Sequence, residues 1–392
     1  MNKIKDKFVS EIDDSTPLLF TPLKLGEVTL KNRVVISPMC QYSATNGLAN
    51  DWHSIHLGQY ALGGSGLVFC EAAAVEERGR ITHGDLGIWS AEHAAALKPI
   101  VSFISAQGSV PGIQIAHAGR KASMQRPWFG NGPLGESDFT RGEKAWDIVA
   151  PSPEPINEKY LMPHELTISE IQETQTAFAK AAGHADAAGF EVLEIHSAHG
   201  YLSHTFLSPL SNLRNDEYGG DLNGRMRFTL ETIEKVRAVW PARKPLFVRI
   251  STIDGADDGW TLEDSIVLTN EMKSRGVDVI DCSSGGIAGP VTASREPLPL
   301  GFRVSLSDEL RRNNKILTMT HGLILHANQA EKILQSGKAD LIGIAREALY
   351  NPYWARHAAN ELGFDESYSD WPDQYGWWLT RREAHLKDIG AR

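Results

Sequence analysis

The stretch FEVLEIHSAHGY, residues 190 to 201, runs from an apolar segment directly into two histidines and a tyrosine. The apolar part predicts a short buried strand, and His196, His199 and Tyr201 follow at its carboxyl end. In barrels of alternating strands and helices, the active mouth is built from residues at the carboxyl ends of the strands. The stretch therefore indicates a chemical site at the end of a barrel strand.

The two histidines allow three interpretations. A pair three residues apart can ligate a metal, or both rings can be buried structural residues. No third ligand is obvious nearby in the sequence. As hydrogen-bond donors, His196 and His199 would hold one carbonyl or nitro oxygen, while Tyr201 delivers a proton. We therefore expect His196 and His199 to act as hydrogen-bond donors, and we expect no metal at this site.

Composition limits the class of protein. The chain has 392 residues, 42% of them hydrophobic, and a net charge of -10 without a basic stripe, so neither nucleic acid nor an anionic membrane is expected as partner. Its three cysteines, Cys40, Cys70 and Cys282, lack the spacing of a disulfide framework or zinc site. Residues 1–16 resemble a flexible extension rather than a signal peptide, so we expect a cytoplasmic protein.

Short apolar runs alternate with amphipathic segments along the chain, which predicts parallel strands covered by helices. Their number, about eight, favours a TIM barrel, (β/α)8. An open doubly wound sheet is the alternative, but no Gly-x-Gly-x-x-Gly turn follows the first run. The predicted strands are residues 33–38, 66–72, 112–117, 190–196, 246–251, 279–284, 316–322 and 341–346.

Three segments between the strands have clear helix signals: 167–188 begins with a capping pattern, 225–240 is amphipathic, and 328–336 stops at Gly337. Residues 19–34 predict a hairpin around Gly26, which we expect to plug the amino-terminal mouth of the barrel.

The remaining segments complete a one-domain prediction. Residues 121–162, after the third strand, are too long for an ordinary connection, and we interpret them as a lid. One domain is expected over 17–392, and the aromatic segment 366–392 is expected to form a subunit interface.

Other strand ends also carry polar or reactive groups. Gln114 offers a donor and an acceptor to a heterocycle with adjacent carbonyl and N–H groups, and Arg249 would stabilise negative charge on it. Loop amides and a cation after the last two strands would hold a phosphate. Ring and phosphate together suggest a mononucleotide. The positions that would line it are Ala72, Gln114, Arg249, Gly322, Ala345 and Arg346. The first strand ends at Ser37, Pro38, Met39 and Cys40, which add a hydroxyl and a thiol to the strand ends.

Several motifs in order resemble the old yellow enzyme family of FMN-dependent ene-reductases, in the branch of thermostable members and xenobiotic reductases. The resemblance covers nearly the whole chain. The motifs are SPMCQYSA (37–44), DLGIWS (85–90), HAGRKA (117–122), HSAHGYL (196–202), FLSPLSNLRNDEYGG (206–220) and DCSSGG (281–286).

This resemblance implies a non-covalently bound FMN, with NADPH or NADH as hydride donor and NADPH expected. The substrates would be activated alkenes, whose carbonyl or nitro oxygen binds His196 and His199 while Tyr201 protonates the alpha carbon. By resemblance, Ser37, Pro38, Met39 and Cys40 cover the remaining side of the flavin. Cys40 also lies near the substrate, and Tyr42 shapes the substrate pocket. A small buried hydrophobe at Cys40, an aromatic wall at Tyr42 and an ion-paired core cation at Arg249 are the competing interpretations.

The resemblance also implies a homodimer or homotetramer, in which a C-terminal aromatic enters the neighbouring site. Trp378 matches that position and Trp377 is the second candidate. Trp128 in the lid is a secondary substrate contact.

Two positions depart from the family pattern. Ala345 replaces a glycine, and its methyl group is tolerated if its φ is negative. His321 stands where relatives have an acid, and it is either a cation near the phosphate or an exposed turn residue.

Two other functions remain as alternatives. A dienoyl-CoA-type reductase would need an iron-sulfur cysteine cluster, which the sequence does not contain. A non-catalytic flavin-binding module would not need the intact set of two histidines and a tyrosine.

Overall fold

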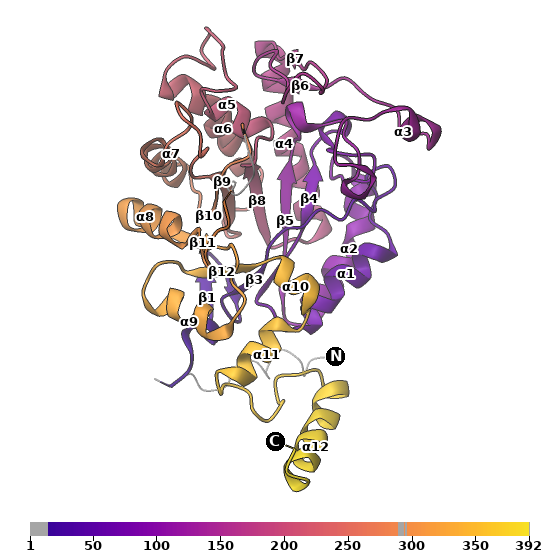
Figure 1. Cartoon of the computed structure of the whole chain (residues 1–392), viewed down its shortest axis with the longest axis vertical. Coiled ribbons are helices and arrows are strands. Elements are labelled where there is room, and N and C mark those ends of the chain that lie inside the picture. Colours follow the sequence, from indigo (N-terminus) through magenta and orange to yellow (C-terminus); the bar gives the residue numbers. More distant parts are fainter. Residues whose placement is uncertain (1–14, 289–293, 295, 392) are drawn as a thin grey trace.

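Eight parallel strands form a closed barrel in the computed structural model, which describes residues 15–288, 294 and 296–391 (Figure 1). Neighbouring strands follow in chain order and the last pairs with the first, so the predicted TIM barrel is confirmed. The strands are β3 Val34–Ile36, β4 Leu67–Ala74, β5 Val110–Ala116, β8 Val192–Ser197, β9 Leu246–Ser251, β10 Val279–Ser283, β11 Leu317–Thr320 and β12 Leu341–Ile344. Most of the predicted extension 1–16 lies outside the described residues.

Helices cover the outside of the barrel. In α4 the predicted capping pattern is confirmed, because Thr167 and Glu170 exchange hydrogen bonds at the first turn, and Gly189 ends the helix with φ +96°. Within the described residues, no helix has both the length and the apolar character needed to cross a membrane. The outer helices are α1 Asp51–Leu62, α2 Ala91–Ala106, α4 Ile168–Ala188, α6 Leu222–Arg237, α7 Leu262–Ser274, α8 Val304–Asn314, α9 Ala327–Gln335 and α11 Trp354–Glu361.

Alternation along each strand sorts the side chains into two environments. On β8, Leu193 and Ile195 belong to the apolar layer between barrel and helices, whereas Val192 packs inside the barrel. Because successive side chains point to opposite faces, Glu194 and His196 share the inner face with Val192. The barrel interior therefore changes from apolar at its base to charged in the middle and reactive at the mouth.

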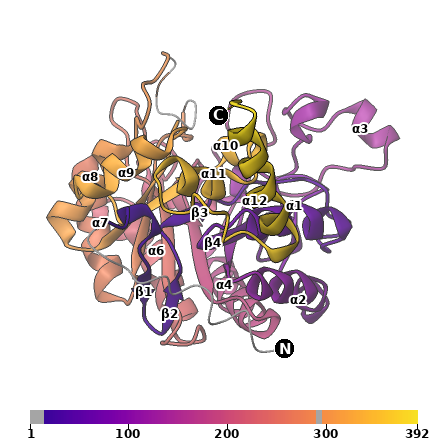
Figure 2. The same cartoon turned by 90° about the horizontal axis from the view of Figure 1, so that it is seen from below.

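The base of the barrel is closed by the antiparallel hairpin of β1 Leu23–Leu25 and β2 Val28–Leu30 (Figure 2). Its apolar side chains pack in one buried cluster with Val35 and Phe247 of the barrel interior, which confirms the predicted plug. At the turn, Gly26 has φ +58°, and a Cβ there would lie 2.5 Å from the carbonyl oxygen of Arg243. A glycine is therefore required at this position.

Two further segments extend from the barrel. The long connection from β5 to α4 contains α3 Glu136–Thr140 and the short pair β6 Val149–Ala150 and β7 His164–Glu165, and α3 stands out at one edge of the molecule (Figure 1). The function of this segment as a lid stays a prediction. At the other end of the molecule, α12 Asp373–Asp388 projects away from the barrel.

Candidate active site

His196, His199 and Tyr201 gather at the carboxyl end of β8, as the sequence predicts. The ring centroids of His196 and His199 are 5.1 Å apart, and those of His196 and Tyr201 are 5.0 Å apart. His199 has φ +60° and Gly200 has φ +74°, so the chain turns sharply after the strand. This turn brings the three rings to one place, at the cost of a left-handed conformation at a non-glycine residue.

Both imidazoles are neutral in this environment. Burial, followed by the positive charge of Arg249, holds the pKa of His196 and the pKa of His199 well below their usual range. A neutral imidazole carries one N–H. Nδ1 of His196 accepts a hydrogen bond of 3.3 Å from the backbone N–H of Ala198, so the ring proton is on Nε2. His196 therefore keeps one donor for a ligand.

Tyr201 keeps its phenolic proton. Burial, followed by Cys40 and Asp85, raises the pKa of Tyr201 far above its usual range. Tyr201 is therefore a phenol, not a phenolate, near neutral pH.

Lys121 lies beside Tyr201. Its Nζ is 5.8 Å from the centre of the Tyr201 ring and donates hydrogen bonds of 2.6 Å to the carbonyl oxygens of His199 and Gly286. Lys121 is predicted from the sequence only as the first residue of the lid, although its place in the HAGRKA motif directly after β5 indicates a position at the mouth.

Tyr42 and Trp128 come together across the mouth. Tyr42 adopts φ +52°, and its ring centroid lies 6.0 Å from that of Trp128. Burial, then Cys40 and Tyr201, raises the pKa of Tyr42. Burial, then Asp85 and Glu71, raises the pKa of the Cys40 thiol. Both Tyr42 and Cys40 are therefore protonated near neutral pH.

A layer of polar groups lies inside the barrel below this mouth. Gln114 and Glu194 are register partners on β5 and β8, and Nε2 of Gln114 donates a 2.7 Å hydrogen bond to Oε1 of Glu194. Nε of Arg249 lies 3.2 Å from Oδ2 of Asp281, so Arg249 does have the ion-pair partner that the competing interpretation requires. Burial, followed by the charge of Asp281, raises the pKa of Glu194.

His321 belongs to the same layer. It is buried, with Nε2 at 3.1 Å from Oδ1 of Asp281 and 2.9 Å from Nη2 of Arg249, so the interpretation as an exposed turn residue is wrong. Burial lowers the pKa of His321 to about 4, with Asp281 opposing and Arg249 adding to the effect. Near neutral pH, His321 is therefore a neutral hydrogen-bonding residue rather than a cation.

A cavity of about 280 Å³ opens beside this layer. Gly322 on its wall has φ +114°, and a Cβ there would lie 2.8 Å from the Phe302 ring. Ala345 has φ -121°, the negative value at which a methyl group is tolerated. The hydroxyl of Ser37 is buried with no hydrogen-bond partner among the described residues. The cavity is lined in part by His199, Arg249, Arg303, Gly322, Ala345 and Arg346.

These residues fit a cofactor with an aromatic ring and a phosphate. The amino group of Gln114 is bonded to Glu194, which leaves the amide oxygen for an N–H, and its register partner Ala72 adds only a methyl group. Arg303 and Arg346 provide positive charge at the cavity. No group of three or more histidine, cysteine or acidic residues suited to a metal occurs among the described residues.

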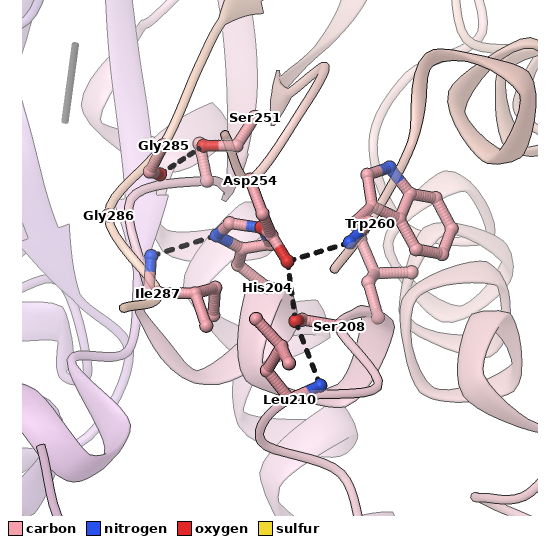
Figure 3. A network of polar contacts seen from close by, with 12 residues as sticks. His204, Ser208, Leu210, Ser251, Asp254, Trp260, Gly285, Gly286 and Ile287 are labelled. Carbon is pink, nitrogen blue, oxygen red and sulfur yellow. Dashed lines mark hydrogen bonds and ion pairs between the residues drawn. The ribbon is translucent and has the colours of Figure 1, made fainter. Parts of the chain in front are cut away.

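A buried network that sequence analysis missed supports the loop after β8 (Figure 3). Nε2 of His204 lies 2.9 Å from Oδ1 of Asp254, and Ser208 donates a 2.6 Å hydrogen bond to Oδ2 of the same carboxylate. Nδ1 of His204 accepts the N–H of Gly200 at 2.9 Å. Burial alone would raise the pKa of Asp254, but hydrogen bonds from His204 and Ser208 lower it. The network anchors the turn that carries His199 and Tyr201.

Trp378, predicted to contact the substrate of a neighbouring subunit, does not lie at the mouth of the barrel in its own chain (Figure 1). It lies on α12 and is 66% exposed, while Trp377 beside it is 51% exposed. Figure 1 shows α12 away from the barrel. An approach to a neighbouring site stays a prediction for both residues.

Comparisons with known proteins show related sequences and a shared fold. The model of the NADH:flavin oxidoreductase / NADH oxidase family matches residues 18–364. The NADPH dehydrogenase of Bacillus cytotoxicus is 46% identical over 349 residues, covering 88% of this chain and 93% of that protein. That of Listeria innocua is also 46% identical, over 347 residues, covering 88% and 95%.

Two solved structures share the fold. Morphinone reductase has a TM-score of 0.72 at 24% identity, covering 88% of this chain and 90% of its own. The old yellow enzyme homologue from Zymomonas mobilis has a TM-score of 0.71 at 24% identity, covering 88% and 93%.

Proposed function

We propose, from the premise that this chain belongs to the NADH:flavin oxidoreductase / NADH oxidase family, that it reduces activated alkenes. The chain is an oxidoreductase of the old yellow enzyme type, with FMN as cofactor and a reduced nicotinamide as hydride donor. NADPH is the proposed donor, since the relatives are named NADPH dehydrogenases. The proposed substrates are α,β-unsaturated carbonyl and nitro compounds.

The polar layer is proposed to hold the cofactor. Gln114 and Arg249 would face the pyrimidine edge of the ring, and Ala72 with the segment from Ser37 to Cys40 would line its other sides. Gly322, Ala345 and Arg346 would hold the phosphate. Bound FMN supplies hydride transfer from the nicotinamide to the alkene.

The groups at the mouth are proposed to bind and protonate the substrate. His196 and His199 would donate hydrogen bonds to the carbonyl or nitro oxygen, which draws electron density from the double bond. One hydride and one proton saturate that bond, and Tyr201 would give the proton, since its raised pKa keeps it protonated. Cys40 and Tyr42 would shape the pocket, with Trp128 at its edge.

The observation that carries this proposal is the set of three rings at the end of β8, two neutral imidazoles and a protonated phenol, 5.0 and 5.1 Å apart. A metal hydrolase would need further ligands, and a non-catalytic flavin module would not need this set.

The test follows the flavin colour under anaerobic conditions. NADPH should bleach the yellow holoenzyme, and 2-cyclohexenone or a maleimide should restore the colour with formation of the saturated product. Reduction by NADPH without reoxidation by any enone, nitroalkene or maleimide would contradict ene-reduction while leaving the family assignment intact.

We also propose a homodimer or homotetramer in which Trp378 approaches the neighbouring site. Support comes from two adjacent exposed tryptophans on a projecting helix, because exposed aromatic side chains are enriched at interfaces.

A further inference from the structure

Ser283 ends strand β10 directly beside His199. Its side chain is fully buried, and its Oγ lies 2.6 Å from Nε2 of His199. Ser283 is the register partner of Ser251 on β9, so two hydroxyl groups lie next to each other at the His199 turn. Their hydrogen bonds determine how His199 is held.

The hydroxyl of Ser251 already has its partners. It accepts the backbone N–H of His199 at 3.0 Å and donates its proton to the carbonyl oxygen of Gly285 at 2.8 Å. Ser251 therefore fixes the backbone of His199, and it has no proton left for the imidazole.

The hydroxyl of Ser283 has one proton, and among the described residues Nε2 of His199 is the one acceptor recorded within hydrogen-bond distance. If Nε2 carried the ring proton and donated it to Ser283, the serine proton would be buried without an acceptor, which is costly. If Ser283 donates to Nε2, every proton in the contact is satisfied. The single proton of the neutral imidazole is then on Nδ1.

We propose that Ser283 is a positioning residue that holds His199 in the Nδ1–H tautomer. His199 then offers Nδ1–H to a ligand while His196 offers Nε2–H, so that both rings donate to one substrate oxygen. Neither imidazole presents a lone pair to that oxygen. The tautomer assignment rests on these contacts and on the neutral state of the His199 ring, whereas its effect on turnover depends on the proposed function.

Nuclear magnetic resonance tests the tautomer directly. In holoenzyme with 15N-labelled histidine, the ring nitrogens of His199, assigned by comparison with His199→Asn, should show a protonated Nδ1 and an unprotonated Nε2. In Ser283→Ala the protonation of Nε2 should increase, because the proton donor to Nε2 is gone. Ser283→Thr keeps the hydroxyl and should restore the wild-type pattern.

Kinetics test the consequence in the same variants. Ser283→Ala should raise the KM for 2-cyclohexenone about tenfold, the effect of one hydrogen bond, with the flavin content unchanged. Ser307→Ala is the matched control, because Ser307 is a buried serine whose hydroxyl, within the described part of the chain, bonds the backbone carbonyls of Val304 and Lys338.

The results separate the two proposals. A protonated Nε2 in the wild type, or an unchanged His199 signal in Ser283→Ala, would overturn the role of Ser283. A wild-type enzyme with the expected tautomer but no ene-reductase activity would overturn the proposed function and leave the tautomer assignment intact.

Discussion

Gln114 and Glu194 face each other across β5 and β8, and Nε2 of Gln114 donates a 2.7 Å hydrogen bond to Oε1 of Glu194. The bond fixes the direction of the amide, because the amino group is committed to Glu194 and the carbonyl oxygen is left for another partner. A glutamine held in this way can distinguish an N–H from a carbonyl group on a ligand. Because Gln114 is the proposed contact to the ring, we expect Glu194 to act on cofactor binding through Gln114.

Glu194→Leu should weaken FMN binding by about tenfold or more, since Gln114 loses the partner that orients it. The dissociation constant can be measured by flavin fluorescence. Glu173→Gln, on the exposed face of α4, is the control and should bind FMN as the wild type does. Equal FMN affinity in Glu194→Leu and wild type would show that the orientation of Gln114 does not matter.

Tyr201→Phe should slow the oxidative half-reaction by about a hundredfold or more, because the proton donor is removed. Flavin reduction by NADPH needs no proton from Tyr201 and should be unchanged. Stopped-flow absorbance separates the two half-reactions. Tyr218→Phe, which loses only a hydrogen bond to Glu231, should leave both rates unchanged. A normal oxidative rate in Tyr201→Phe would assign the proton to another group.

The pH dependence of stability should depend on His321, whose pKa falls from 6.5 to about 4 on folding. Below pH 6.5 the unfolded chain binds a proton that the folded protein does not, so the free energy of unfolding should decrease as pH falls toward 4. The contribution is roughly 1.4 kcal/mol for each pH unit crossed in that window. Above pH 6.5 the His321 ring is neutral in both states, so it no longer makes the free energy of unfolding depend on pH.

Chemical denaturation of wild type and His321→Gln at several pH values measures this effect. Carboxylates contribute to both proteins, so the difference between the two pH profiles isolates His321. Parallel profiles would mean that His321 binds its proton equally well in the folded and unfolded states.

Gly26→Ala should destabilise the protein by roughly 2 kcal/mol or more, since it adds both a left-handed φ and a Cβ at 2.5 Å from the carbonyl of Arg243. Gly363→Ala separates the two causes, because Gly363 has φ +72° with open space around it. That variant should lose only about 1 kcal/mol. Urea denaturation measures both, and equal losses would show that contact with Arg243 is harmless.

Trp378→Ala should raise the KM for 2-cyclohexenone severalfold if its side chain enters a neighbouring site. Tyr350→Ala removes a side chain that is 87% exposed on another helix and is the control. Trp377→Ala distinguishes the two candidates. Unchanged kinetics in both tryptophan variants, together with a monomeric mass in solution, would contradict the proposed interface.

The sequence alone predicted the eight barrel strands, the hairpin at the base and three of the outer helices. Apolar runs of strand length, capping residues such as Thr167 and Glu170, and a stop at Gly337 act over a few neighbouring residues, so they are visible in the chain. The strand over Leu246–Ser251 was predicted to its ends, and the hairpin at Gly26 was found from its turn. His196, His199 and Tyr201 were found because they are adjacent in the sequence.

The tertiary structure decided which distant groups share the site and in which protonation state. Ser283 and His199 are 84 residues apart, and only the register of β9 with β10 and the turn after β8 bring their side chains to 2.6 Å. The burial of His321 and its contact with Asp281 likewise depend on barrel closure. Desolvation and hydrogen bonding are properties of the packed interior, so the sequence specified the residues while the fold determined their pKa values and their partners.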